Sequence, residues 1–241
     1  MPRQQRKVAA LPAVLLAAAG GLWAAQGENR VAGHGHGHGA GEAQEQVVES
    51  MAGKPMHQGP HFKWTELRPA APGDAERAEE IVRTLRGELE KYRDYQAAIE
   101  AGYKPFLKDT PQPQVHFTNY RLGMQAAFRF DPAQPTSLLY RKKGEGFELI
   151  GAMYTAPQRT TEEELNARIP LSVVQWHQHV NICLPPLGSG KQANWRVFGP
   201  AGSIATEAEC EEAGGRFKAV LFGWMVHVNP FEETAEKIWK H

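Results

Sequence analysis

The fold is decided by one stretch of the chain, Val173-Val174-Gln175-Trp176-His177-Gln178-His179-Val180-Asn181-Ile182-Cys183. It lies between Pro170 and Pro185 and is rich in β-branched and aromatic residues, which predicts a long strand. Residues two apart in a strand point to the same face. The imidazoles of His177 and His179 should therefore project together, at a separation that one metal ion can bridge.

Further strands are expected on either side of this stretch. The segment Lys142-Lys143-Gly144-Glu145-Gly146 is a hairpin signal between two strands. The expected strands are residues 114–120, 137–141, 147–154 and 219–228. This strand content favours a mainly antiparallel sheet, and the HxH strand suggests by analogy that the sheet could close into a small cupin-like barrel.

Two helical segments complete the predicted domain, residues 75–241. The first begins at Asp74 as its N-cap and carries one apolar stripe: Ile81, Val82, Leu85, Leu89 and Tyr92. A stretch from Tyr95 to Ala101 extends it, and Gly102 ends it. The second is short, with Thr206 and Glu209 as a capping box and Gly214-Gly215 as its stop. The predicted class is α+β, with an N-terminal helix packed on the sheet.

Two more histidines fall within predicted strands. His227 lies in Met225-Val226-His227-Val228, and His116 lies in Val115-His116-Phe117. The predicted metal ligands are therefore His177, His179, His227 and His116, and a transition-metal ion, zinc or copper, is the predicted cofactor. The strand pattern fixes the face of each histidine but not whether the four side chains meet in space. The alternative is therefore that each histidine is a hydrogen-bonded residue of the core. His241 lies outside every predicted strand.

Other donors could join or replace these histidines. Glu148 shares a predicted face with apolar residues and could be a ligand or a partner of one, or an edge glutamate facing solvent. Met153 and Met225 would favour copper if they approached the site, and otherwise fill the core. The Gly-His repeat at residues 33–39 could chelate metal as a flexible arm or act as a spacer.

The only two cysteines, Cys183 and Cys210, admit two interpretations. In an oxidising compartment an even pair predicts a disulfide. It would close a loop of about 27 residues, a constraint worth on the order of 3 kcal/mol. Alternatively, Cys183 is a metal ligand.

The N-terminal residues 1–25 predict export. Arg3, Arg6 and Lys7 precede an uncharged apolar run from Val8 to Ala25, the layout of a signal peptide or of a retained membrane anchor. Residues 26–74 carry little apolar mass and predict a disordered His/Gly-rich linker. The protein should be periplasmic or extracellular. It should contact a membrane only through residues 1–25, if these are not cleaved. A net charge of zero argues against a nucleic-acid partner.

Several segments together resemble a family of uncharacterised exported bacterial proteins. They are Ala101-Gly102-Tyr103, Val115-His116-Phe117-Thr118-Asn119, Asp131 to Tyr140 with its DPxxP and LxY spacing, Leu149 to Tyr154, and the WHxHxNxC run. The resemblance covers most of residues 90–230 and implies a shared domain without an established activity. The family often has a glutamate where this chain has Met153, so no ligand role is carried over to that position.

Three functions remain open at this point. The first is an extracytoplasmic protein that binds a transition metal through strand histidines. The second is a metal-dependent hydrolase or oxygenase at the same site. The third is a non-catalytic envelope or interaction domain with structural histidines. A GxSxG elbow, a phosphate-binding loop, a CxxC pair and a CxxCH haem motif are all absent from the sequence.

Overall fold

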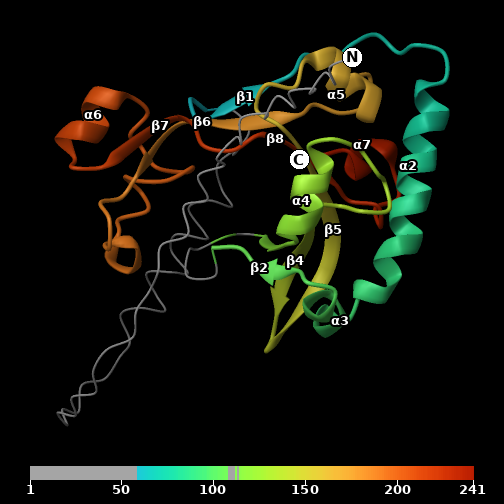
Figure 1. The fold of residues 1–241 in the computed structure, drawn as a ribbon, viewed down its shortest axis with the longest axis horizontal. Helices are drawn as coiled ribbons and strands as arrows, with labels where there is room; N and C mark the ends of the chain where they lie inside the picture. Colours follow the sequence, from blue (N-terminus) through green and yellow to red (C-terminus); the bar gives the residue numbers. More distant parts are fainter. Residues whose placement is uncertain (1–58, 108–111, 113) are drawn as a thin grey trace, which may run out of the picture. The chain divides into compact units, whose positions relative to one another are not determined.

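The structure is a computed structural model that describes residues 59–107, 112 and 114–241. All of them belong to one compact unit, residues 38–241. They form an α+β fold with an eight-stranded antiparallel sheet (Figure 1). The strands are β1 (Phe62–Trp64), β2 (Lys104–Pro105), β3 (Val115–Thr118), β4 (Ser137–Lys143), β5 (Gly146–Ala156), β6 (His177–Leu184), β7 (Arg216–Val220) and β8 (Trp224–Val228). The predicted class and the antiparallel sheet are confirmed.

The strands follow the order β1-β6-β8-β5-β4-β3-β2, and β7 pairs with β6 outside this path. The HxH strand β6 is thus the junction of the sheet, with β1, β7 and β8 as its neighbours. The order has two ends, so the sheet is not closed and does not form the cupin-like barrel.

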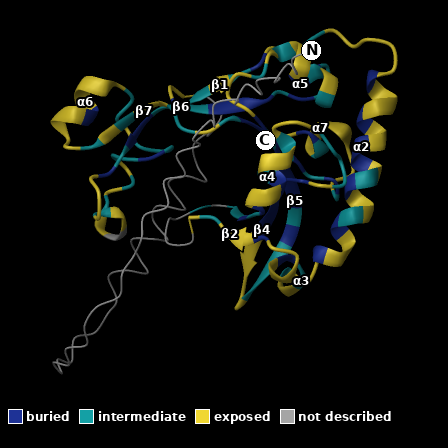
Figure 2. Cartoon of the chain, viewed as in Figure 1, coloured by how far each residue is buried: buried dark blue, intermediate teal, exposed yellow. Residues whose placement is uncertain are grey.

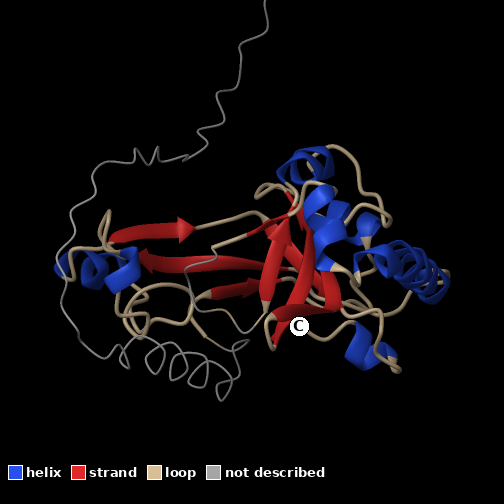
Figure 3. Cartoon of the chain, turned by 90° about the horizontal axis from the view of Figure 1, so that it is seen from below, coloured by secondary structure: helices blue, strands red, loops and turns tan. Residues whose placement is uncertain are grey.

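Six α-helices lie in the described part of the chain, most of them gathered beside the strands (Figure 3). They are α2 (Asp74–Leu89), α3 (Tyr95–Glu100), α4 (Tyr120–Ala126), α5 (Glu162–Arg168), α6 (Glu207–Glu212) and α7 (Ala235–Ile238), with 3-10 turns at Glu90–Tyr92 and Gly190–Gln192. No helix among the described residues has the length and apolar character needed to span a bilayer.

Helix α2 buries the predicted apolar stripe, including Leu85 and Leu89, against the main core. Its N-cap is Gly73, whose φ of 87° suits a residue without a side chain, and not Asp74 as predicted. The Asp74 carboxylate accepts hydrogen bonds from the Ser172 hydroxyl and the Ala71 amide, which lower its pKa. The helix start is therefore tied to the loop before β6.

Three tyrosines within the family-like segments hold the core together. Each hydroxyl donates to a backbone carbonyl: Tyr103 to Pro135, Tyr140 to Tyr92, and Tyr154 to Pro132. Burial raises the pKa of all three hydroxyls. These segments therefore build the packing of the domain.

The sheet has two chemically different faces, as the strand register shows. The helix face carries the main core, including Phe117, Leu138, Tyr140, Ala152, Tyr154, Val226 and Val228. The opposite face carries His116, Leu139, Met153, Met225, His227, His177 and His179, which alternate with the first set along each strand. We call this second surface the histidine face. In Figure 2, β5 is mostly buried or of intermediate exposure, whereas α2 alternates between buried and exposed residues.

Two strand boundaries differ from the prediction. The predicted strand 219–228 is wrong, because it is two strands, β7 and β8, separated at residues 221–223. At Gly223 a Cβ atom would lie 2.1 Å from the Ala156 carbonyl oxygen, so close backbone packing breaks the run. Strand β6 begins at His177 and not at Val173, since the preceding residues form a turn after Pro170.

The linker predicted for residues 26–74 extends too far. Within it, β1 pairs with β6, placing Phe62 opposite His179 and Trp64 opposite His177. The His61 ring supports this pairing, with Nδ1 3.0 Å from the Asn181 carbonyl oxygen and Nε2 2.9 Å from that of Gly202. Aromatic burial repays the ordering of these few residues. The signal segment and His34, His36, His38 and His57 lie outside the described residues.

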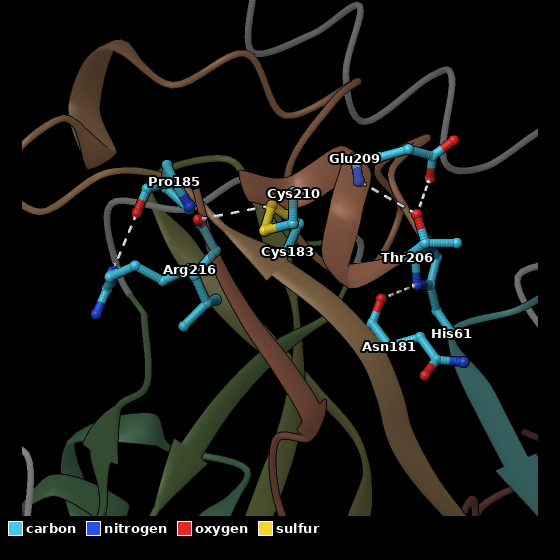
Figure 4. Close-up of a disulfide and its surroundings, with 9 residues drawn as sticks. His61, Asn181, Cys183, Pro185, Thr206, Glu209, Cys210 and Arg216 are labelled. Carbon is cyan, nitrogen blue, oxygen red and sulfur yellow. Dashed lines mark hydrogen bonds between the residues drawn. A yellow bond between two sulfur atoms is a disulfide. The ribbon is translucent and has the colours of Figure 1, made fainter. Parts of the chain in front are cut away.

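The predicted disulfide is present and joins β6 to α6 (Figure 4). Cys183 and Cys210 are both fully buried. Gly215 packs against them, and a Cβ there would lie 2.4 Å from the Cys183 sulfur. The alternative in which Cys183 is a metal ligand is therefore wrong. The predicted helix at 206–213 is confirmed as α6, with Thr206 accepting from the Glu209 amide.

Candidate metal centre

Three imidazoles meet on the histidine face. They come from His177 in β6, His227 in β8 and His241 beyond α7. Each offers one nitrogen, and these nitrogens all lie within 4.8 Å of one another. The triad could hold a metal ion.

Two nitrogen pairs in this region have the spacing that a metal ion imposes. The Nε2 atoms of His177 and His241 are 3.2 Å apart, and those of His116 and His227 are 3.4 Å apart. An ion bound tetrahedrally by nitrogens at about 2.0–2.1 Å holds neighbouring donors about 3.3 Å apart. The same spacing also suits a hydrogen bond between two neutral imidazoles.

The curvature of the sheet brings distant strands together. Strand β3, with His116, lies three steps from β8, with His227. At about 4.8 Å a step, a flat sheet would separate them by about 14 Å. A 3.4 Å contact therefore requires the histidine face to be concave. A register shift at Leu139/Tyr140 and the close approach of Gly151 to β8, where a Cβ would lie 2.4 Å from the Val228 oxygen, permit this bend.

The C-terminal segment is held in place by one side chain. The Asn229 amide group donates to the carbonyl oxygens of Lys237 and Lys240, and its backbone N–H donates to that of Ile238. These bonds fold the segment back beside β8. The His241 ring stacks on His227, with centroids 4.2 Å apart.

Burial keeps three imidazoles of this face neutral. It lowers the pKa of His116 to about 4 and, with repulsion from His116 and His61, that of His179 to about 4. The pKa of His227 is also well below 6.5, because of burial first and then His241, His116, His177 and His179. A neutral imidazole has a free lone pair, the state that binds a metal. These three imidazoles therefore need to lose no proton before they bind an ion at neutral pH.

The four predicted ligands all lie on the histidine face, in different positions. His177 and His227 belong to the triad, and His116 touches His227. His179 lies beside His177, with ring centroids 5.4 Å apart, and its buried Nδ1 has no hydrogen-bond partner among the described residues. The sequence pattern does not predict His241 as a ligand, because a histidine after a short C-terminal helix carries no periodic signal.

The triad contains no acidic ligand. Among the described residues, these three imidazoles are the one group of histidine, cysteine or carboxylate donors close enough together to hold an ion. Glu148 forms ion pairs with Arg141 and Lys143, so the solvent-facing alternative holds for it. A bound ion would keep its full positive charge within the protein.

Aromatic rings surround the triad. Trp64 lies 5.0 Å from His177 and 5.3 Å from His241 between ring centroids. Phe62 lies 4.9 Å from His179, and Phe222 lies 6.2 Å from the same ring. Apolar rings beside a metal site lower the local dielectric constant.

Comparisons of the chain with protein-family models, with curated proteins and with solved structures found no match. The function is therefore inferred from the geometry of the histidine cluster.

Proposed function

We propose that this protein is exported and binds one transition-metal ion through His177, His227 and His241, with His116 as the next ligand. The convergence of three imidazoles on one concave face is the observation that carries the proposal. The fourth predicted ligand, His179, would complete or support the site. Imidazole ligands suit zinc and copper, the two ions that the sequence predicts.

The disulfide supports a location outside the cytoplasm. Such bonds persist in oxidising compartments and are rare in reducing ones. The basic and apolar N-terminal sequence agrees with this location. The uncharacterised exported family that the sequence resembles would then share the fold, with ligands that differ at Met153.

Metal analysis of the purified full chain tests the proposal. All arms carry the H34A/H36A/H38A substitutions, so that the Gly-His repeat does not contribute. We expect one tightly held equivalent of metal, reduced to below about a tenth of an equivalent by His177→Ala, His227→Ala or His241→Ala. His61→Ala is the control, because it removes a buried imidazole that bonds only to carbonyls. Full metal content in all three triad variants would overturn the proposal.

A metal-dependent enzyme is the second candidate. The observation that favours it is the number of donors: three nitrogens within mutual reach leave one position of a tetrahedral ion for water or substrate. Titration of the metal-loaded protein with azide, followed spectroscopically with cobalt or copper, tests for that position. Azide binding that disappears in His116→Ala would instead show that His116 shapes the open position.

A further inference from the structure

Both histidines that the sheet contributes to the triad face a methionine across the strands. Met153 is the direct partner of His227, and Met225 is the direct partner of His177. Directly opposed residues in an antiparallel pair have Cβ atoms about 4.5–5.5 Å apart. The two thioethers therefore flank the imidazoles on the same face.

These methionines belong to a very small apolar cluster. Its buried members are Leu139, Met153 and Met225, separate from the main core on the opposite face. Both methionines are 7% exposed. Aliphatic residues with fixed rotamers would fill such a place as well, whereas methionine is flexible enough to turn its sulfur toward an ion.

The charge of the ion matters at this position. All the grouped donors are imidazoles, which supply no negative charge, and no carboxylate or thiolate is grouped with them in the described part of the chain. The cost of burying an ion scales with the square of its charge, so a monovalent ion costs about a quarter as much as a divalent ion of the same size. A partly buried site without an anionic ligand therefore favours the lower charge.

From these observations we propose that the site selects monovalent copper, with the sulfur of Met153 or Met225 joining the imidazoles. Thioether and imidazole ligands together suit Cu(I), whereas zinc has little use for a thioether. This inference rests on the proposed metal-binding function and names its ion.

Competition titrations under anaerobic conditions test the selectivity. The full chain with H34A/H36A/H38A is titrated with Cu(I) against bicinchoninate and with Zn(II) against a zinc-binding dye. We expect tighter binding of Cu(I). In M153L/M225L we expect Cu(I) affinity to fall about tenfold or more and Zn(II) affinity to stay within about threefold.

Met124→Leu is the matched control, since Met124 is 67% exposed on α4. It should leave both affinities unchanged. X-ray absorption at the copper edge should show a sulfur scatterer that is lost in M153L/M225L, and circular dichroism checks that this variant folds.

The outcomes separate this inference from the function on which it rests. Tighter binding of Zn(II), or Cu(I) affinity unchanged in M153L/M225L, overturns the Cu(I) assignment and leaves a metal protein. Failure to bind either ion, with the variants and the parent alike, overturns both.

Discussion

The two faces of the sheet are built from the same strands but carry different kinds of side chain. On the helix face, buried apolar side chains pack against α2, and the tyrosine hydroxyls all find carbonyl acceptors. On the histidine face, the buried apolar cluster among the described residues has three members, and the imidazoles lie beside it. Adjacent residues such as Leu138 and Leu139 belong to different faces.

The difference indicates where stability and function reside. Burial of apolar area and satisfied polar groups stabilise a fold. Buried imidazoles held neutral by their surroundings give up hydration for little packing in return. We infer that the helix face carries the stability of the domain and that the histidine face accepts a cost in exchange for metal binding.

Acid should have the largest effect on the stability of the histidine face. The folded pKa of His116 and of His179 is about 4, against about 6.5 for an unfolded histidine. The unfolded chain therefore binds more protons between these values, and the metal-free protein should lose stability as pH falls from about 6.5 to about 4. Each pKa unit of difference contributes about 1.4 kcal/mol, so the total loss should reach several kcal/mol.

Urea denaturation at a series of pH values measures this loss. The carboxylates with lowered pKa, such as Asp74 and Glu148, act in a different window, because they destabilise the fold only below about 4.5. A free energy of unfolding that stays constant from pH 7 to 5 would contradict the neutral state assigned to the cluster.

Truncation on the helix face comes next in size. Leu138→Ala removes a fully buried side chain from the main core and should cost about 2–5 kcal/mol. Its metal affinity should be unchanged while the protein remains folded, since Leu138 points away from the histidines. Chemical denaturation and a metal titration on the same sample check both statements. A selective loss of metal binding would show that the faces are coupled.

Removal of the disulfide tests the far end of β6. C183S/C210S opens a loop spanning 27 residues, which should cost about 3 kcal/mol. The proposed ligand His177 lies at the opposite end of the same strand, where it is paired with β1 and β8. We expect the metal affinity to survive in this variant, as measured by isothermal titration. Loss of metal with the fold intact would instead assign the disulfide a role in shaping the site.

The sequence predicted the sheet because its strands alternate, and alternation is a local signal. The shared face of His177 and His179, the hairpin of β4 and β5 and the helix α2 all follow from patterns within one element. The site depended on longer-range facts. The curl that brings His116 to His227 arises from a register shift, and the position of His241 arises from the bonds of Asn229. Neither leaves a periodic trace in the chain.

Residues 62–64 are a second case in which a long-range contact decides the structure. By composition they belonged to a linker, because few apolar residues surround them in the sequence. Phe62 and Trp64 become ordered because β6 offers an unpaired edge and the histidines offer ring surfaces. A partner far away in sequence supplied the energy that the local composition lacked.

The smallest expected effect on stability tests directly whether the histidine face lowers the stability of the fold. His227→Leu keeps a side chain of similar size and removes the imidazole whose ring contacts His116, His177 and His241. If the histidine face costs stability for the sake of function, this substitution should raise the free energy of unfolding of the metal-free protein at pH 7 by up to about 1 kcal/mol. It should also flatten the acid dependence and abolish metal binding. A loss of more than about 2 kcal/mol would mean that the imidazole stabilises the fold itself, because such a loss is the mark of a broken buried network. In that case the two faces would share one task, and the division between a stabilising face and a metal-binding face would fail.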